Sequence, residues 1–566
     1  MKTRLMILTA AVALGTVTAG LTATATVDGV GGAATGDATF PLSYATINAA
    51  MVDVRTLEAA GGTTISVTAQ TVDESAGILL DNDFPLTIDG AVAGSVYGGE
   101  LAHIRITSSG IGIAGAAAAM VINNDTGGGV TLRDLILTPS TGTGGGVSAR
   151  ALQSYNRAAG STVSHLFERV MFTAIRPTGH PNAGQPVTNP FVHAASADTR
   201  VARLAELRAF SGGGGNNAVE LRSNAAPSVG ALMTYDLNHC YFTHIVLDAA
   251  PPLSRGGGLV ISRTAEVTVN INEGCVFSYN DGSGVRTVGT LAPATADINV
   301  NGTITDPVFF IYNGWQEDIT GAARNEGFYA DCDVDINYAY AIGNYQDGID
   351  FAGGGNDTIS NTYIADNQRD LDTSIGVAPD TTTAANLTMT GTANTTTLAN
   401  VTIHNNNAPT AGNGRTLRAS FGTGTPTITA SNLIASGAGD VYELVGTGAA
   451  IYNEDDSALV QDGAHTLNSV AIAGSVVQTV TDRVATGGGA SDPNFVSTTF
   501  APVFSVPFTA PAGLDDYLRV NPVGAANLAF ASAASPARTN PVSAINVTGA
   551  NPNGAVPVEL SVFSAN

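Results

Sequence analysis

Three stretches in the middle of the chain share one pattern: LNHCYFT (residues 237–243), NEGCVFS (272–278) and DPVFFIY (306–312). Each has polar or turn-forming residues near its start and continues as a short apolar strand that carries a phenylalanine, Phe242, Phe277 or Phe310. The unit can be read seven more times between residues 132 and 436, at intervals of 24 to 39 residues. A nearly constant interval predicts a solenoid, because every coil needs the same strands while its turns vary in length.

The repeat also predicts which side chains face the core. The last inward apolar residues of the ten units are Leu137, Phe172, Phe210, Phe242, Phe277, Phe310, Val334, Ile364, Ile403 and Ile434. Side chains alternate along a strand, so the residue two positions earlier also points inward, which places Cys240, Cys275 and Cys332 in a core column. We interpret these cysteines as small core residues, with a disulfide or metal role as the alternative.

Asparagine recurs three positions after the inward residue in five consecutive units. These residues are Asn280, Asn313, Asn337, Asn367 and Asn406. Asparagine tolerates the left-handed conformation of a turn, and stacked amides can hydrogen-bond to one another. The spacing therefore predicts an asparagine ladder inside one turn of the solenoid.

Composition agrees with a β-rich repeat array. Charged residues make up only 12% of the 566, glycine occurs 66 times, and the mean hydropathy is slightly positive, which argues against disorder. The excess of 47 acidic over 23 basic residues gives a net charge of −24. Nucleic-acid binding needs basic patches, so this charge argues against it. No run of eighteen apolar residues predicts a transmembrane segment.

The N-terminus has the features of a secretory signal peptide, predicted over residues 1–25. Lys2 and Arg4 precede a short apolar core, and Ala23-Thr24-Ala25 is a suitable cleavage site. We expect a linker over residues 26–42, the β-helix over 43–545 and a C-terminal tail over 546–566. The expected location is outside a bacterial cell, either secreted or at the cell surface.

Segments near both ends resemble the pectin-lyase-like superfamily of right-handed β-helix proteins. SYATINAA (43–50), GGTTISV (61–67) and LTIDG (86–90) are similar to its entry, and DPNF (492–495) is similar to its closing coils. The resemblance implies an all-β fold, a single right-handed parallel β-helix solenoid with a short N-terminal capping helix. That superfamily includes polysaccharide lyases, glycoside hydrolases, tailspikes and adhesins, so the fold does not choose the function.

Asp331, Asp333 and Asp335 alternate with apolar residues and form a candidate metal site. Three carboxylates on one outer strip could hold Ca²⁺, which is the one cofactor that the sequence suggests and which pectate lyases of this fold use. A solvated acidic strip is the alternative.

NYQDGID (344–350), followed by NQRDLD (367–372), is similar to the catalytic motifs of polygalacturonases in a partial way. The resemblance makes Asp347, Asp350 and Asp370 candidate acid and base groups on neighbouring coils, with Arg369 beside them. In a lyase, Arg369 or Arg324 would be the candidate base. The Gly-His-Gly and Arg-x-Lys motifs of that family are missing.

Tyr241, Phe309 and Tyr363 occupy outward positions next to the inward residues and form a candidate glycan-binding strip. Aromatic rings stack on sugar rings, but a mostly apolar column can also be a second packing layer.

These features favour a secreted or cell-surface β-helix with a structural or adhesive role, in contact with a polysaccharide or a cell-surface glycan. A polysaccharide lyase or glycoside hydrolase that acts on uronate-containing, pectin-like polymers is the alternative. An enzyme would require the candidate carboxylates and an arginine to meet in one place.

Overall fold

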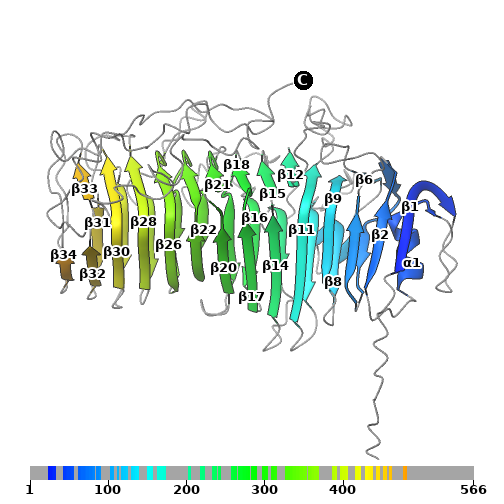
Figure 1. Cartoon of the computed structure of the whole chain (residues 1–566), viewed down its shortest axis with the longest axis horizontal. Helices are drawn as coiled ribbons and strands as arrows, with labels where there is room; N and C mark the ends of the chain where they lie inside the picture. The colour runs from blue at the N-terminus through cyan, green and yellow to red at the C-terminus, as the bar shows by residue number, and fades with distance from the viewer. Residues whose placement is uncertain are drawn as a thin grey trace, which may run out of the picture.

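The computed structural model describes the strands and the helix shown in Figure 1, between residues 23 and 480, with some of their turns. Residues 1–22 and 481–566 lie outside the described part, as do short stretches of several turns. The longer internal gaps are 33–42, 56–61, 91–101, 139–149, 157–161, 174–201, 206–216, 223–231, 244–256, 290–295, 315–325, 369–384, 406–414, 422–426 and 462–475.

Two parallel sheets run through the described part of the chain. The larger, sheet A, has 22 strands among the described residues. They are β1 (Ala23–Gly32), β2 (Thr63–Val67), β3 (Thr71–Glu74), β5 (Leu86–Asp89), β6 (Ala102–Ile106), β9 (Val130–Thr138), β11 (Thr162–Thr173), β12 (Ala202–Ala205), β14 (Leu232–Asn238), β15 (Cys240–Thr243), β17 (Glu266–Asn272), β18 (Val276–Ser278), β20 (Ala296–Asn301), β21 (Val308–Ile311), β23 (Asp333–Asn337), β24 (Ala339–Ile342), β26 (Asn356–Ala365), β28 (Thr395–Asn405), β30 (Thr427–Gly437), β32 (Ala450–Asp455), β33 (Ala458–Gln461) and β34 (Val476–Val480).

The smaller, sheet B, has 12 strands and is parallel except where β7 pairs antiparallel with β8. Its strands are β4 (Ile78–Leu80), β7 (Ile111–Ile113), β8 (Ala116–Asn124), β10 (Arg150–Asn156), β13 (Asn217–Arg222), β16 (Gly257–Arg263), β19 (Val285–Gly289), β22 (Phe328–Ala330), β25 (Ile349–Phe351), β27 (Ala385–Gly391), β29 (Arg415–Phe421) and β31 (Tyr442–Gly446).

Sheet A bends along its length into two stacks of strands. The first stack includes β14, β17, β20 and β23, and the second includes β15, β18, β21 and β24, whereas β26, β28 and β30 run through both. At the bend, Asp134, Tyr338, Asn361 and Asn400 have φ between 48° and 56°. One residue in this left-handed conformation turns the chain from the first stack into the second.

Each coil therefore passes through the first stack, the bend, the second stack, a turn and a strand of sheet B before the next coil begins. The fold is a single right-handed parallel β-helix, which agrees with the solenoid that the repeat predicts and with the fold that the resemblance implies. In Figure 1 the strands lie side by side along the axis, with β1 at one end and β34 at the other.

The strand register confirms most of the predicted inward column. Leu137, Phe172, Phe242, Phe277, Phe310, Ile364 and Ile403 occupy it. Val334 faces the core as predicted, but from the first stack, and Ala341 holds its place in this column. The prediction for Ile434 was wrong, because Ala435 holds that place. Phe210 lies outside the described residues, and Leu204 stands between Phe172 and Phe242 in the register. In these coils the inward residue is smaller than the pattern demanded.

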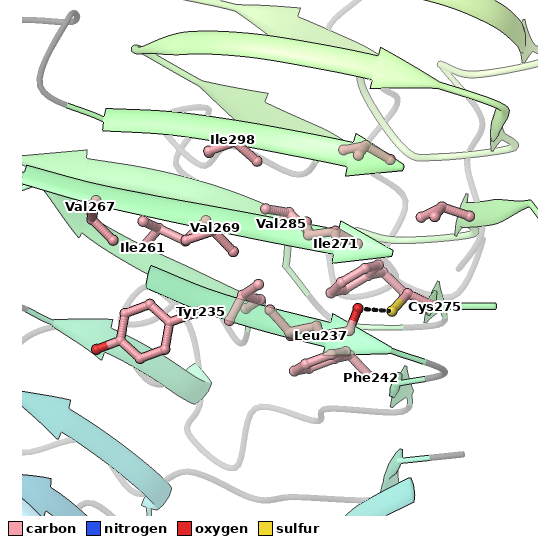
Figure 2. Close-up of a cluster of buried hydrophobic side chains, with 14 of the residues drawn as sticks. Tyr235, Leu237, Phe242, Ile261, Val267, Val269, Ile271, Cys275, Val285 and Ile298 are labelled. Carbon is pink, nitrogen blue, oxygen red and sulfur yellow. Dashed lines mark hydrogen bonds between the residues drawn. The ribbon is translucent and has the colours of Figure 1, made fainter. Parts of the chain in front are cut away.

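Apolar side chains fill the space between the stacks and sheet B. Figure 2 shows one section, where Leu237, Phe242 and Ile271 meet residues of sheet B. Cys275 and Cys332 are both buried, and the Cys275 thiol donates to the Leu237 carbonyl at 3.4 Å. Cys332 precedes β23 in the first stack, so it lies in a different column from Cys275. The interpretation of both as core residues holds.

One described helix, α1 (Ile47–Val54), packs against the first coil, as predicted for a cap. Thr46 is its N-cap and accepts from Ala49 N, and buried Glu74 accepts from Ile47 N. Residues 26–32, predicted as linker, belong to β1, whose Ala25 is buried and paired with Ile65. Cleavage after Ala25 would divide this strand.

Within the part of the chain that the structure describes, no helix combines the length and the apolar character needed to cross a bilayer.

Candidate functional site

Three carboxylates meet at the edge of sheet B. Asp350 lies on β25, and Glu326 and Asp347 lie in the turns directly before β22 and β25. One oxygen atom from each lies within 4.8 Å of the others. We call these three residues the carboxylate cluster.

Glycines set the local geometry of the cluster. Gly327 follows Glu326 and Gly348 follows Asp347, where the chain passes the neighbouring turn closely. A Cβ at Gly348 would lie 2.4 Å from Asn367 Nδ2, and one at Gly327 would lie 2.6 Å from Asn344 Nδ2. A larger side chain at either place would clash with the neighbouring turn. Glycine therefore lets successive coils approach closely, with Glu326 and Asp347 at equivalent positions just before sheet B.

Asp347 is held firmly by the next coil. Its Oδ1 accepts from Ala385 N at 2.7 Å and from the Thr388 hydroxyl. The side chain is buried, and burial raises the pKa of Asp347 to about 7. The nearby Glu326 charge also raises this pKa, whereas the two hydrogen bonds and Arg418 lower it.

Glu326 is equally enclosed, because it is 2% exposed and accepts a hydrogen bond of 2.9 Å from the Ser283 hydroxyl. Asp350 is the most accessible member of the cluster. It points outward, because the residues on either side of it, Ile349 and Phe351, are in the core.

An outer column of sheet B passes through the cluster. The strand register places Arg286, Tyr329, Asp350, Thr388 and Arg418 on successive coils. Asp350 therefore has an arginine two coils away on each side, at roughly 10 Å by strand spacing.

This arrangement has two chemical capacities. Hard oxygen donors this close suit a cation such as Ca²⁺. Paired carboxyl groups about 5 Å apart can also act as acid and nucleophile on a glycosidic bond. With Glu326 and Asp347 buried, only Asp350 presents part of its surface to a large partner.

The sequence predicted part of this site. Asp347 and Asp350, two of the predicted catalytic candidates, both belong to the carboxylate cluster. Asp370, Arg369 and Arg324 lie outside the described residues. Glu326 was missed, although Glu326-Gly327-Phe328 repeats the acidic–Gly–apolar order of Asp347-Gly348-Ile349 one coil earlier.

The three aspartates of the predicted calcium site, Asp331, Asp333 and Asp335, do not come together. Among the described residues, the group of three carboxylates that does come together is the carboxylate cluster. Asp331 hydrogen-bonds to the Thr287 hydroxyl. Asp333 accepts from Asn356 N at 2.9 Å, and exposed Asp335 lies two residues further along β23. The alternation of a strand keeps the latter two about 7 Å apart, too far to share one ion closely.

The predicted glycan-binding strip is a packing layer where it can be described. Phe309 and Tyr363 stack on Tyr340, each at a ring-centroid distance of 5.2 Å. Phe309 is 1% exposed and Tyr363 is 3% exposed, so neither ring face is open to a sugar. Tyr241 lies on β15, but its side chain is outside the described part.

Comparison with known proteins adds little. No family model and no curated protein matches the chain. A solved structure, the GH136 lacto-N-biosidase from Eubacterium ramulus, aligns over 81% of this chain and 68% of its own, with 9% identity and a TM-score of 0.25. The β-helix assignment rests on the strand pairings described above, and membership of the pectin-lyase-like superfamily stays a prediction.

Proposed function

We propose that this protein is an exported, non-catalytic β-helix with a structural or adhesive role at a bacterial surface. The observation that carries the proposal is that the conspicuous polar and aromatic residues bond to neighbouring coils. Asp347 bonds to Ala385 and Thr388, and Phe309 and Tyr363 stack on Tyr340. These groups stabilise a scaffold.

The shape supports the same role. Eleven strands of sheet B follow one another from β4 to β31 without interruption. Ten intervals of about 4.8 Å give a stack roughly 48 Å long. A rigid rod of this kind holds its two ends apart and offers a long lateral surface for contact with a glycan. Export is proposed on the signal-like residues 1–25.

The test is incubation with a panel of uronate-containing and neutral polysaccharides, with and without Ca²⁺. We expect no new reducing ends and no unsaturated products, together with retention on at least one immobilised cell-surface glycan. Product formation from any polymer would overturn the proposal, and failure to bind any of the glycans would remove its adhesive part.

The second candidate is a glycan-cleaving enzyme that uses the carboxylate cluster. The observation in its favour is that a carboxyl group with a pKa of about 7 lies within 4.8 Å of two others. Asp350, the accessible member, would attack the sugar carbon or activate water, and Asp347 would give its proton to the leaving oxygen after a movement that uncovers it.

If the panel yields a product, Asp350→Asn should lower the rate by about a hundredfold or more. Asp73→Asn is the matched control, because Asp73 is an exposed aspartate of sheet A paired with Arg105. Equal activity of the two variants would remove the cluster from the reaction.

A further inference from the structure

The outer face of the first stack carries a regular array of short polar side chains. Six consecutive strands, β17, β20, β23, β26, β28 and β30, each contribute three outward residues in register. We call these eighteen residues the polar grid: Thr268, Asn270, Asn272, Asp297, Asn299, Asn301, Asp333, Asp335, Asn337, Asn356, Thr358, Ser360, Thr395, Thr397, Ala399, Thr427, Thr429 and Ser431.

The grid is open and nearly uniform in chemistry. Seventeen of its members are threonine, asparagine, aspartate or serine, and the other is Ala399. All eighteen are exposed or half-buried, and Asp297, Asn301, Asp335 and Thr429 are among the exposed ones. The strands that carry it lie side by side in Figure 1.

The grid is also stiff. Along its columns, Asn299 donates to Asn270 Oδ1 at 2.9 Å, Asn301 donates to Asn272 Oδ1 at 3.1 Å, and Ser360 donates to Asn337 Oδ1 at 3.0 Å. Threonine has restricted χ1 angles on a strand. The polar atoms are therefore held at about 4.8 Å between coils and about 6.6 Å along each strand.

The chemistry of the grid excludes several partners. None of its eighteen members is cationic, so it does not suit a nucleic acid or an anionic polymer. None is aromatic, so it lacks the rings that stack on sugars. Its three carboxylates are too few to form a charged mineral-binding layer.

A fitting partner is a flat solid that is uncharged, that both donates and accepts hydrogen bonds, and that repeats on a similar scale. Ice meets these conditions, because its surface is a lattice of water molecules with regularly spaced oxygen atoms. Hydroxyl and amide groups can replace lattice waters one for one, and a stiff array loses little conformational entropy on contact.

We propose that the polar grid binds the surface of ice. Individual contacts are weak, but seventeen polar side chains held in register engage together. A threonine-rich continuation of the middle column, Thr24, Thr64, Thr87 and Thr131, lies at the far end of the same stack and would extend the contact. The inference goes beyond the proposed function, since it concerns a different surface and does not depend on glycan contact.

The experiment uses the full chain and slow growth of polycrystalline ice from a dilute protein solution. We expect the protein to be enriched in the ice fraction relative to bovine serum albumin and to inhibit ice recrystallisation. Thr397→Tyr and Thr429→Tyr each place a bulky ring in the middle column, so the enrichment should fall by about tenfold.

Thr71→Tyr is the control, because Thr71 is an exposed threonine on β3 in the second stack, away from the grid. It should enter ice like the unaltered protein, and circular dichroism checks that all variants fold. Exclusion of the unaltered protein from ice would overturn the proposal, as would equal entry of the grid variants and the control. Grid-dependent retention on crystalline cellulose or chitin without entry into ice would also overturn it.

Discussion

At the scale of single residues, the least expected group is an aspartate in the core. Asp357 pairs with Val334 in register, points inward and is 2% exposed. Burial, followed by the charges of Asp333 and Asp335, raises the pKa of Asp357 to about 8 from an ordinary 3.8. The side chain is therefore neutral in the folded protein at neutral pH.

This neutrality predicts a pH-dependent stability. Below about pH 4 the carboxyl is protonated in both the folded and the unfolded states, and its effect on stability is most favourable. As the pH rises towards 8, the unfolded state releases the proton while the folded state keeps it, so the free energy of unfolding falls, by an amount on the order of a few kcal/mol.

Asp357→Asn should flatten this fall in urea denaturation between pH 5 and pH 8. The remaining slope belongs in part to Asp347, whose pKa is also raised. Asp73→Asn should keep the full slope. A slope in Asp357→Asn equal to that of the unaltered protein would contradict the assignment.

At the scale of elements, the asparagine ladder shows what the sequence could predict. Asn280, Asn313 and Asn367 belong to it as predicted, Asn344 holds the place predicted for Asn337, and Asn386 on β27 adds a further rung. Asn406 lies outside the described residues. Asn344 follows Gly343, whose φ of 68° makes the turn, whereas Asn337 is the last residue of β23, just before the bend.

The wrong prediction of Asn337 has its cause in one short coil. The pattern placed the inward residue at Val334, because alanine at 341 is small for a core residue. The asparagine three positions after Val334 was therefore assigned to the ladder in place of Asn344. Large inward residues could be predicted from the sequence. Small ones such as Ala341 could not, because larger apolar residues beside them fill the core and hide their position in the pattern.

The candidate site was predictable to a similar degree. Asp347 and Asp350 lie in one motif of seven residues, so their proximity could be inferred. Glu326 comes from the preceding coil, and its position depends on how the chain between Asn313 and Glu326 is folded. Sequence spacing does not determine that path.

Asn344→Ala should interrupt the ladder. The Asn344 amide donates to the Phe310 carbonyl at 2.9 Å and to Asn367 Oδ1 at 2.8 Å, and its own oxygen accepts from Asn313. Buried groups left without partners should lower the free energy of unfolding by about 2 to 4 kcal/mol, as measured by urea denaturation.

Asn301→Ala is the matched control, since Asn301 bonds to an asparagine of the adjacent coil at the exposed surface. It should change stability by about 0.5 kcal/mol or less. Similar losses in the two variants would show that burial of the ladder contributes nothing.

At the scale of the whole molecule, the core that is open at the N-terminal end of the solenoid must be covered. Helix α1 supplies it with Ile47, Ala50, Met51 and Val54, all fully buried. Without the helix, core side chains and strand edges of the first coil would be exposed and would pair with other chains.

Met51→Asp should detach α1 and cause concentration-dependent association, measured by size-exclusion chromatography with light scattering. Val52→Asp places the same charge on the same helix at a residue that is 45% exposed, so its molar mass should match that of the unaltered protein. Identical masses for both variants would show that α1 does not protect the end.

The stacking of coils also has a mechanical consequence. Each coil is bonded mainly to the two beside it, so tension applied between the ends loads one row of hydrogen bonds at a time. The solenoid would unfold coil by coil, so the chain would lengthen in steps and mechanical work would be dissipated at each step. A molecule that tethers a cell to a solid would in this way yield under a sudden pull without breaking its attachment.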